Sequence, residues 1–331
     1  MKRRILLRGA LAAGLAGPGL AALTHTRHEL DAALSADHST TDVGFWESTA
    51  ERHSFGYSGQ TPVDMLSSLL DDFADLRRSL SRAQTVQNRT ALCHATGQMA
   101  GMAAIVLHDL GQHREAHRWF GTAARAAEQS GDRLLHAWVA AREAMVPLNY
   151  GAPQAAALLA EKARHLAGET PSAASALASA VASRAYAVTG DRDRAMKSVA
   201  ETEALAGRLS PQQRADTWFG YPMQKHFVHT SQALTVLGET DRAYQAQARA
   251  LELSRAPSLM TRALIAIDQA SCRAQDGEQA EAARLTAEAY GGLPAAYRTG
   301  LTETRARALH RSLPPGTPGA DRLADALGSP V

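Results

Sequence analysis

The chain has 331 residues, of which 45% are hydrophobic and 5% aromatic, and its 35 lysines and arginines nearly balance 33 aspartates and glutamates. This apolar content excludes a disordered chain, and the scarcity of aromatic residues argues against a protein built of sheets. A net charge of +2 with no basic stripe gives no electrostatic basis for direct binding to nucleic acid. The two cysteines, Cys93 and Cys272, stand far apart in helical patterns and are expected to be buried thiols.

Residues 1–41 form a leader with a basic start and an apolar middle. Basic residues at positions 2 to 4 precede an apolar run over residues 10–23, and this order resembles a twin-arginine export signal. The run has 14 residues, which is too short for a helix that spans a membrane. It also ends without a small-x-small cleavage site. We therefore expect a retained leader, flexible or loosely helical, on a cytoplasmic protein, with export as the alternative.

Helical patterns continue from the leader almost to the end of the chain. Residues 42–82 are expected to form an N-terminal pair of helices, which opens a single helical domain spanning residues 42–313. A closing helix is expected around residues 294–313, and residues 314–331 are expected to form a flexible tail.

One pattern occurs five times in the middle of the chain: a glycine, four further residues, and then an alanine that opens an apolar helix stripe. The pairs are Gly111/Ala116, Gly151/Ala156, Gly190/Ala195, Gly238/Ala243 and Gly277/Ala282. Successive glycines are 40, 39, 48 and 39 residues apart. We expect each glycine to end a first helix in the left-handed conformation, and each alanine to let a second helix approach closely. The pattern predicts five helical hairpins.

The hairpin turns resemble those of tetratricopeptide (TPR) repeats. The resemblance is carried by Leu-Gly-Gln at 110–112, Thr-Gly-Asp at 189–191 and Leu-Gly-Glu at 237–239, each with its following alanine. It implies an all-α fold, a right-handed α-solenoid of about five TPR-like hairpins, each of about 40 residues. In such a solenoid the first helices of the hairpins line a concave groove.

A second resemblance is more specific and covers residues 42–313. It is carried by Trp-Phe-Gly-Tyr at 218–221, by residues 243–253 and by Asp-Gln-Ala-Ser-Cys at 268–272. These segments are similar to the C-terminal TPR-like region of actinobacterial (Streptomyces-type) helix-turn-helix regulators. In that family a leader similar to residues 3–9 often lies between the DNA-binding domain and the repeats. This chain starts at that leader, so we expect neither a helix-turn-helix domain nor direct binding to nucleic acid.

The TPR resemblance also assigns groove positions at fixed offsets before each hairpin glycine. Thirteen residues before, these are Gln98, Trp138, Leu177, Lys225 and Leu264. Six residues before, they are Ile105, Met145, Arg184, Gln232 and Ser271. One or two residues before, they are Asp109, Asn149, Thr189, Val236 and Gln275. Our candidate binding residues at these groove positions are Gln98, Trp138, Asn149, Arg184 and Lys225. A groove of this mixed polarity suits a peptide or an amphipathic small molecule, and an ordinary solvated face is the alternative.

The fourth repeat unit is about eight residues longer than the others, and the extra length falls around Trp218. A glycine and a proline in this stretch should break the helix. The interpretation that we favour is a structural plug that fills the gap between neighbouring units. In the alternative, Trp218 and Tyr221 wall a pocket with Lys225, His229 and Arg184 within reach as polar anchors, and Lys225 and Arg184 are exposed.

No catalytic motif, phosphate-binding loop or paired-carboxylate motif occurs, so we expect no cofactor and no metal site. The histidine pairs His113/His117 and His226/His229 are expected to be a solvated face and packing residues. We expect a regulatory or scaffolding protein without a membrane span that binds a peptide, small molecule or protein partner. The alternatives are an enzyme of specialised-metabolite biosynthesis, with an unrecognised active site in the groove, and an exported binding protein. A homodimer is left open.

Overall fold

The computed structural model describes residues 18–33, 43–57, 59–82, 84–255, 258–298 and 300–328. Within these ranges every regular element is a helix, and no strand occurs. The protein is therefore all-α, as the composition predicted. The basic start of the leader lies outside the described residues, and export stays an untested alternative.

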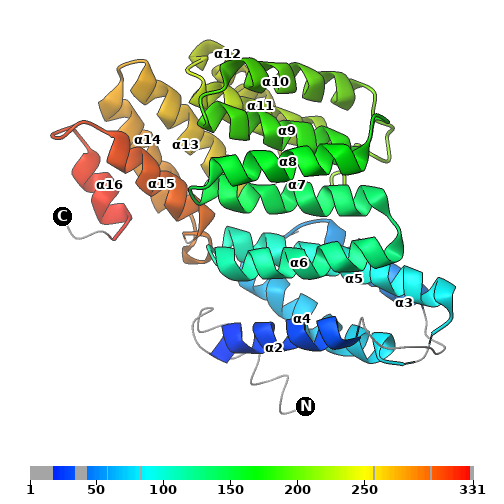
Figure 1. The fold of residues 1–331 in the computed structure, drawn as a ribbon. Coiled ribbons are helices and arrows are strands. Elements are labelled where there is room, and N and C mark those ends of the chain that lie inside the picture. The colour runs from blue at the N-terminus through cyan, green and yellow to red at the C-terminus, as the bar shows by residue number, and fades with distance from the viewer. Residues whose placement is uncertain are drawn as a thin grey trace.

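Three helices form the N-terminal part of the structure (Figure 1). They are α2 (Pro18–Ala33), α3 (Val43–Ser54) and α4 (Pro62–Leu80). Both α3 and α4 fall within the region where a helical pair was expected, and both pack against α5. Helix α2, from the leader, packs against α4 and α6, where Leu23 and Leu30 are fully buried.

The next ten helices pack in consecutive pairs (Figure 1). The first three pairs are α5 (Val86–Asp109) with α6 (His113–Ser130), α7 (Arg133–Asn149) with α8 (Pro153–Ala167), and α9 (Ala173–Val188) with α10 (Arg192–Gly207). The last two pairs are α11 (Met223–Val236) with α12 (Thr240–Leu253), and α13 (Leu259–Gln275) with α14 (Gln279–Gly291).

The turn inside each pair has the backbone that the glycine pattern predicted. All five hairpin glycines have positive φ, namely Gly111 (77°), Gly151 (95°), Gly190 (80°), Gly238 (76°) and Gly277 (89°). A residue with a Cβ is strained in this conformation, so glycine ends the first helix at low cost. The five alanines that follow these glycines are all fully buried, which confirms their expected packing role. These are Ala116, Ala156, Ala195, Ala243 and Ala282.

The first helices of the pairs also pack on one another in the order α5, α7, α9, α11 and α13. After α14 the chain forms the 3-10 turn Ala295–Tyr297 and then α15 (Leu301–Ser312), where a single closing helix was expected. Helix α15 packs on α13 and α14, and its start also reaches α5. A Cβ on Gly111 would lie 2.9 Å from the Cα of Gly300, so the two backbones are in direct contact. The row of inner helices is therefore closed by α15.

The expected tail contains a further helix, α16 (Ala320–Ala326), which packs mainly on α14. Its Leu323 is fully buried, which explains why this segment folds back. Among the described helices, α5 alone is long and apolar enough to span a membrane, and most of its side chains are buried inside the protein. A helix that is apolar all round is also what the centre of a helical core requires.

Candidate ligand-binding pocket

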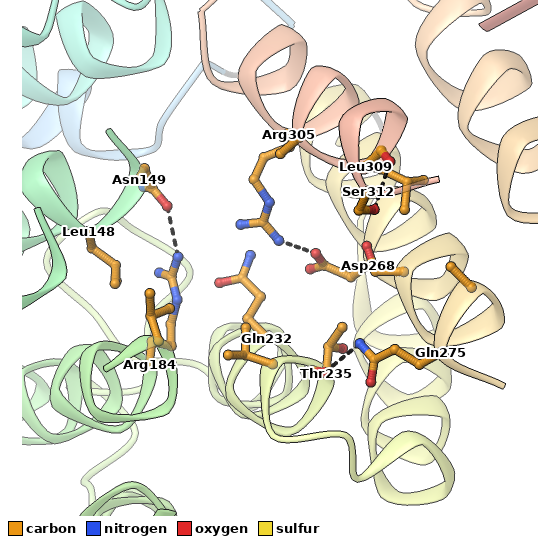
Figure 2. Close-up of a pocket in the computed structure, with 15 residues that line it drawn as sticks. Leu148, Asn149, Arg184, Gln232, Thr235, Asp268, Gln275, Arg305, Leu309 and Ser312 are labelled. Carbon is orange, nitrogen blue, oxygen red and sulfur yellow. Dashed lines mark hydrogen bonds and ion pairs between the residues drawn. The ribbon is translucent and has the colours of Figure 1, made fainter. Parts of the chain in front are cut away.

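A cavity of about 480 Å³ lies where the C-terminal ends of the inner helices meet α15 (Figure 2). Its walls come from five helices, α7, α9, α11, α13 and α15. The lining residues are Leu148, Asn149, Arg184, Val188, Gln232, Thr235, Val236, Asp268, Ser271, Ala274, Gln275, Arg305, Ala308, Leu309 and Ser312. On α9, α11, α13 and α15 lining residues recur at intervals of three or four positions, so each of these helices presents one face to the cavity.

The charged residues of the pocket leave one positive charge in excess. Asp268 is only 1% exposed and forms an ion pair with Arg305 through its Oδ1 atom. Arg184 is 5% exposed, and no carboxylate in the described part of the chain lies within ion-pair distance of it. Burial lowers the pKa of Arg184 to about 9, and the charge of Arg305 adds to this effect while Asp268 opposes it. Arg184 is therefore a charged, buried guanidinium without a counter-ion at neutral pH.

Two buried acceptor atoms in the pocket have no hydrogen-bond partner. They are Oδ2 of Asp268 and Oε1 of Gln232, and the Gln232 residue is 8% exposed. Figure 2 shows Gln232 between Arg184 on one side and the Arg305–Asp268 pair on the other. A buried acceptor without a donor costs about 1–3 kcal/mol of stability, and such atoms are rare in native proteins. The pocket thus contains both an unneutralised cation and unused acceptors.

A chain of hydrogen bonds fixes the orientation of Arg184. Its Nη2 donates to Oδ1 of Asn149 at 3.0 Å, and the Asn149 amide nitrogen donates to Nε2 of His108 at 2.9 Å. The other ring nitrogen of His108 donates to Asp109 at 2.9 Å, and Tyr57 donates to the same carboxylate at 2.6 Å. Because a carboxylate only accepts, His108 carries its proton on Nδ1, and this sets which way the Asn149 amide points. The guanidinium is thereby held in place by three helices and the loop after α3.

The outer part of the pocket is apolar. Val188 and Val236 line it and are 46% and 51% exposed, and Leu148 and Leu309 are buried beside them. Large apolar side chains exposed at the mouth of a polar cavity provide a surface for an apolar part of a ligand. The cavity is therefore amphipathic, with a polar interior and an apolar rim.

The irregular stretch between α10 and α11, residues 209–222, fills the interior next to this pocket; we call it the plug segment. Its backbone carbonyls accept hydrogen bonds from inward-facing side chains. Trp138 donates to the carbonyl of Trp218 at 2.8 Å, and Arg142 donates to the same oxygen at 3.0 Å. Lys225 donates to the carbonyls of Thr217 at 3.0 Å and Gly220 at 2.7 Å. The terminal nitrogens of Arg142 and Lys225 thus donate to the chain's own backbone, whereas Nε of Arg142 is buried without a partner.

Aromatic contacts complete the plug segment. Phe219 packs against Trp138 with ring centres 4.4 Å apart, and Trp218 contacts Tyr57 edge-on at 5.7 Å. Tyr221 is fully buried and stacks against His229 at 6.3 Å. These contacts favour the structural plug over a pocket walled by Trp218 and Tyr221.

The candidate residues from the sequence therefore divide between two places. Asn149 and Arg184 line the pocket, whereas Trp138, Trp218, Tyr221 and Lys225 pack in and around the plug segment. His229 lies between them, with Nδ1 accepting from Arg184 at 3.4 Å. Gln98 is half-buried on α5 and does not line the pocket. Their role in binding stays a prediction.

The expectation that Arg184 and Lys225 are exposed was wrong. Arg184 is buried in the polar interior, and the Lys225 ammonium is enclosed by the plug segment, where burial holds its pKa well below the usual value. Offsets from a repeat glycine identify the side of the helix, and they give no information on the segment that folds over that side. The sequence analysis also missed Asp268 and Arg305 as site residues.

Neither the cysteines nor the His113/His117 pair lines this pocket, although the Cys272 thiol contacts the lining residue Thr235 at 3.3 Å. His113 and His117 are exposed on α6, as expected, while Cys93 and Cys272 are fully buried. Among the described residues, no group of three or more histidine, cysteine and acidic side chains is placed to hold a metal ion.

No protein-family model matches this chain, and a search of curated proteins finds no match either.

Proposed function

We propose that this chain is a TPR-like binding protein that holds a small-molecule ligand in the pocket formed by α7, α9, α11, α13 and α15. In this proposal the five helix pairs are TPR-like hairpins of a right-handed solenoid, and the row of first helices is its concave side. The positive-φ glycines and buried alanines of the turns support that assignment. Ligand occupancy would serve a regulatory or scaffolding role.

The observation that carries the proposal is the set of unpaired polar groups in one cavity. Arg184 lacks a counter-ion, and Asp268 and Gln232 each have a buried acceptor without a donor. Each such group lowers stability by about 1–3 kcal/mol, and folded proteins keep such costs mostly at functional sites. Other buried side-chain atoms without a partner, among them Nε of Arg142 and the hydroxyl of Tyr221 near the plug segment, do not line this cavity.

The size of the cavity favours a small molecule over an extended peptide. A volume of about 480 Å³ falls within the range of about 300–1,000 Å³ that is usual for small-molecule sites. Helix α15 also lies against the ends of the inner helices and so interrupts the open groove that a long peptide would need.

The proposal can be tested by blocking the pocket and screening compounds by thermal shift. Ala308 is an exposed residue of the pocket lining on α15, and Ala248 is an exposed alanine on the outer helix α12. We expect a subset of a chemically diverse library to raise the melting temperature of the wild type and Ala248→Trp, but not of Ala308→Trp. At a ligand concentration of 100 times Kd, the stabilisation is about 2.7 kcal/mol.

Two results would contradict the proposal. One is a library in which no compound stabilises the wild type. The other is equal stabilisation of the wild type and of a folded Ala308→Trp variant, which would place the binding site elsewhere.

A further inference from the structure

The charge balance of the pocket defines the charge of its ligand. Two lining arginines face one lining aspartate, and that aspartate is already paired with Arg305. A ligand with a single negative charge would neutralise the excess at Arg184. A cationic or neutral ligand would leave the buried Arg184 guanidinium without a counter-ion, which is costly in a low-dielectric interior.

The geometry of the two arginines favours a planar oxyanion. Arg184 reaches the cavity from α9 and Arg305 from α15, and Figure 2 shows the two guanidinium groups near the side-chain amide of Gln232. Guanidinium groups bind carboxylates through paired, charge-assisted hydrogen bonds. The charge of Arg305 also lowers the pKa of Arg184, so the two cations are close enough to repel each other. An anion between them would remove that repulsion.

The unpartnered acceptors require a donor on the same ligand. Oδ2 of Asp268 and Oε1 of Gln232 both accept and cannot donate. A hydroxyl or amide N–H next to the acid group of the ligand would satisfy them. The exposed Val188 and Val236 then remain as contacts for an apolar portion at the mouth.

We propose that the ligand is a small amphipathic carboxylic acid with one negative charge. Its carboxylate binds between Arg184 and Arg305, an adjacent N–H or O–H donates to Asp268 and Gln232, and its apolar tail lies against the valines at the rim. This assignment rests on the proposed function, because it names the ligand class of the same pocket.

N-octanoylglycine is a suitable probe, because it combines a carboxylate, an adjacent amide N–H and an apolar chain. N-octanoylglycinamide has the same shape without the charge, and N-octanoylsarcosine keeps the charge but replaces the N–H by N–CH₃. By isothermal titration we expect the acid to bind the wild type at least about tenfold more tightly than the amide, because hydrogen bonds to charged groups are the stronger ones. We expect the sarcosine derivative to bind about five- to tenfold more weakly than the acid.

Arg184→Met tests the anchor. Methionine has a similar length and no charge, so we expect this variant to melt no lower than the wild type, because it removes an unpaired buried cation. It should lose the preference for the acid over the amide. Arg262→Met, which changes an exposed arginine at the other end of α13, should keep that preference and serves as the matched control.

The possible outcomes separate this inference from the proposed function. Equal affinity for the acid and the amide, with both blocked by Ala308→Trp, would overturn the acid assignment and leave a small-molecule pocket standing. An unchanged preference for the acid in folded Arg184→Met would also overturn the assignment. If neither these probes nor any library compound bound the wild type, both the assignment and the proposed function would fall.

Discussion

The two ends of the protein interior are the plug segment and the pocket, and both hold buried basic side chains. At the plug segment, Arg142 and Lys225 donate to backbone carbonyls of the chain itself, and aromatic rings fill the remaining space. At the pocket, Arg184 has no carboxylate partner, and neighbouring acceptors have no donors. The pocket also opens at a rim of exposed valines.

The comparison shows how one architecture uses the same residue types in two ways. An insertion in the fourth unit supplies acceptors at one end, so the basic groups there stabilise the fold. At the other end Arg184 has only the neutral partners Asn149 and His229, and in our proposal a ligand completes its contacts. Changes in the plug segment should therefore affect stability, and changes in the pocket should affect binding. Four predictions test this difference, beginning with the largest effect.

The largest effect is expected from adding one methyl group inside the plug segment. A Cβ on Gly220 would overlap the backbone carbonyl of Ala215, so the segment could not keep its path. We expect Gly220→Ala to lower the free energy of unfolding by about 4 kcal/mol, measured by urea denaturation. Gly207→Ala at the end of α10 has open space around the new Cβ and should cost nothing. Similar midpoints for the two variants would contradict this account of the plug segment.

A second contrast compares a side chain from each end. Trp218→Ala removes the ring that contacts Tyr57, and we expect a loss of about 3 kcal/mol in unfolding free energy. Val236→Ala at the pocket rim changes an exposed side chain and should stay within about 0.5 kcal/mol. Thermal or urea melts of both variants measure these changes in unfolding free energy. A cost for Val236→Ala as large as that for Trp218→Ala would remove the distinction between the two ends.

The hairpin turns directly follow the pocket-lining ends of the inner helices, and a change in one of them should have a smaller effect on stability. Gly190 has φ of 80°, and no atom lies within 4 Å of the position of an added Cβ. The cost of Gly190→Val therefore comes from the left-handed backbone alone, and we expect about 1–2 kcal/mol. An unchanged melting temperature would show that the turn relaxes without cost.

The last effect appears only at acidic pH and concerns His229, which lies between the two ends. Burial and the nearby charges of Arg184, Arg142, Lys225 and His226 hold its pKa well below the usual value, so the native state keeps it neutral. The unfolded chain takes up a proton as the pH falls below about 6.5. Stability is then constant above that pH and decreases below it, by at most about 1.4 kcal/mol per pH unit for this group.

His229→Gln should flatten this decrease in urea melts between about pH 6.5 and pH 5. Part of the slope should remain, because burial also lowers the pKa of His226. Identical slopes in the variant and the wild type would show that His229 is not held neutral in the folded protein.

The turns could be predicted from the sequence because they are local. A glycine that ends a helix and an alanine five residues later depend only on neighbouring residues, and all five pairs have the expected backbone and burial. The same repeat offsets placed Arg184 and Asn149, together with Gln232 and Ser271, on the side of the helices that lines the pocket. Because the same hairpin is repeated, one set of offsets identifies the inward side of each first helix.

The ion pair of the pocket and the burial of Lys225 could not be predicted, because they depend on contacts between distant parts of the chain. Arg305 lies on α15, outside the repeat pattern, and reaches Asp268 only because the chain returns to the ends of the inner helices. The burial of Lys225 depends on the path of the plug segment, which has no repeat to define it. Such contacts follow from the packed structure and have no local pattern in the sequence.

The most direct test of the central claim is a crystal structure of the wild-type protein grown with N-octanoylglycine. The account predicts the carboxylate within hydrogen-bond distance of Arg184 and Arg305, the amide N–H on Gln232 or Asp268, and the chain along Val188 and Val236. Density for the probe at another surface, with the pocket holding only water at a saturating probe concentration, would contradict it.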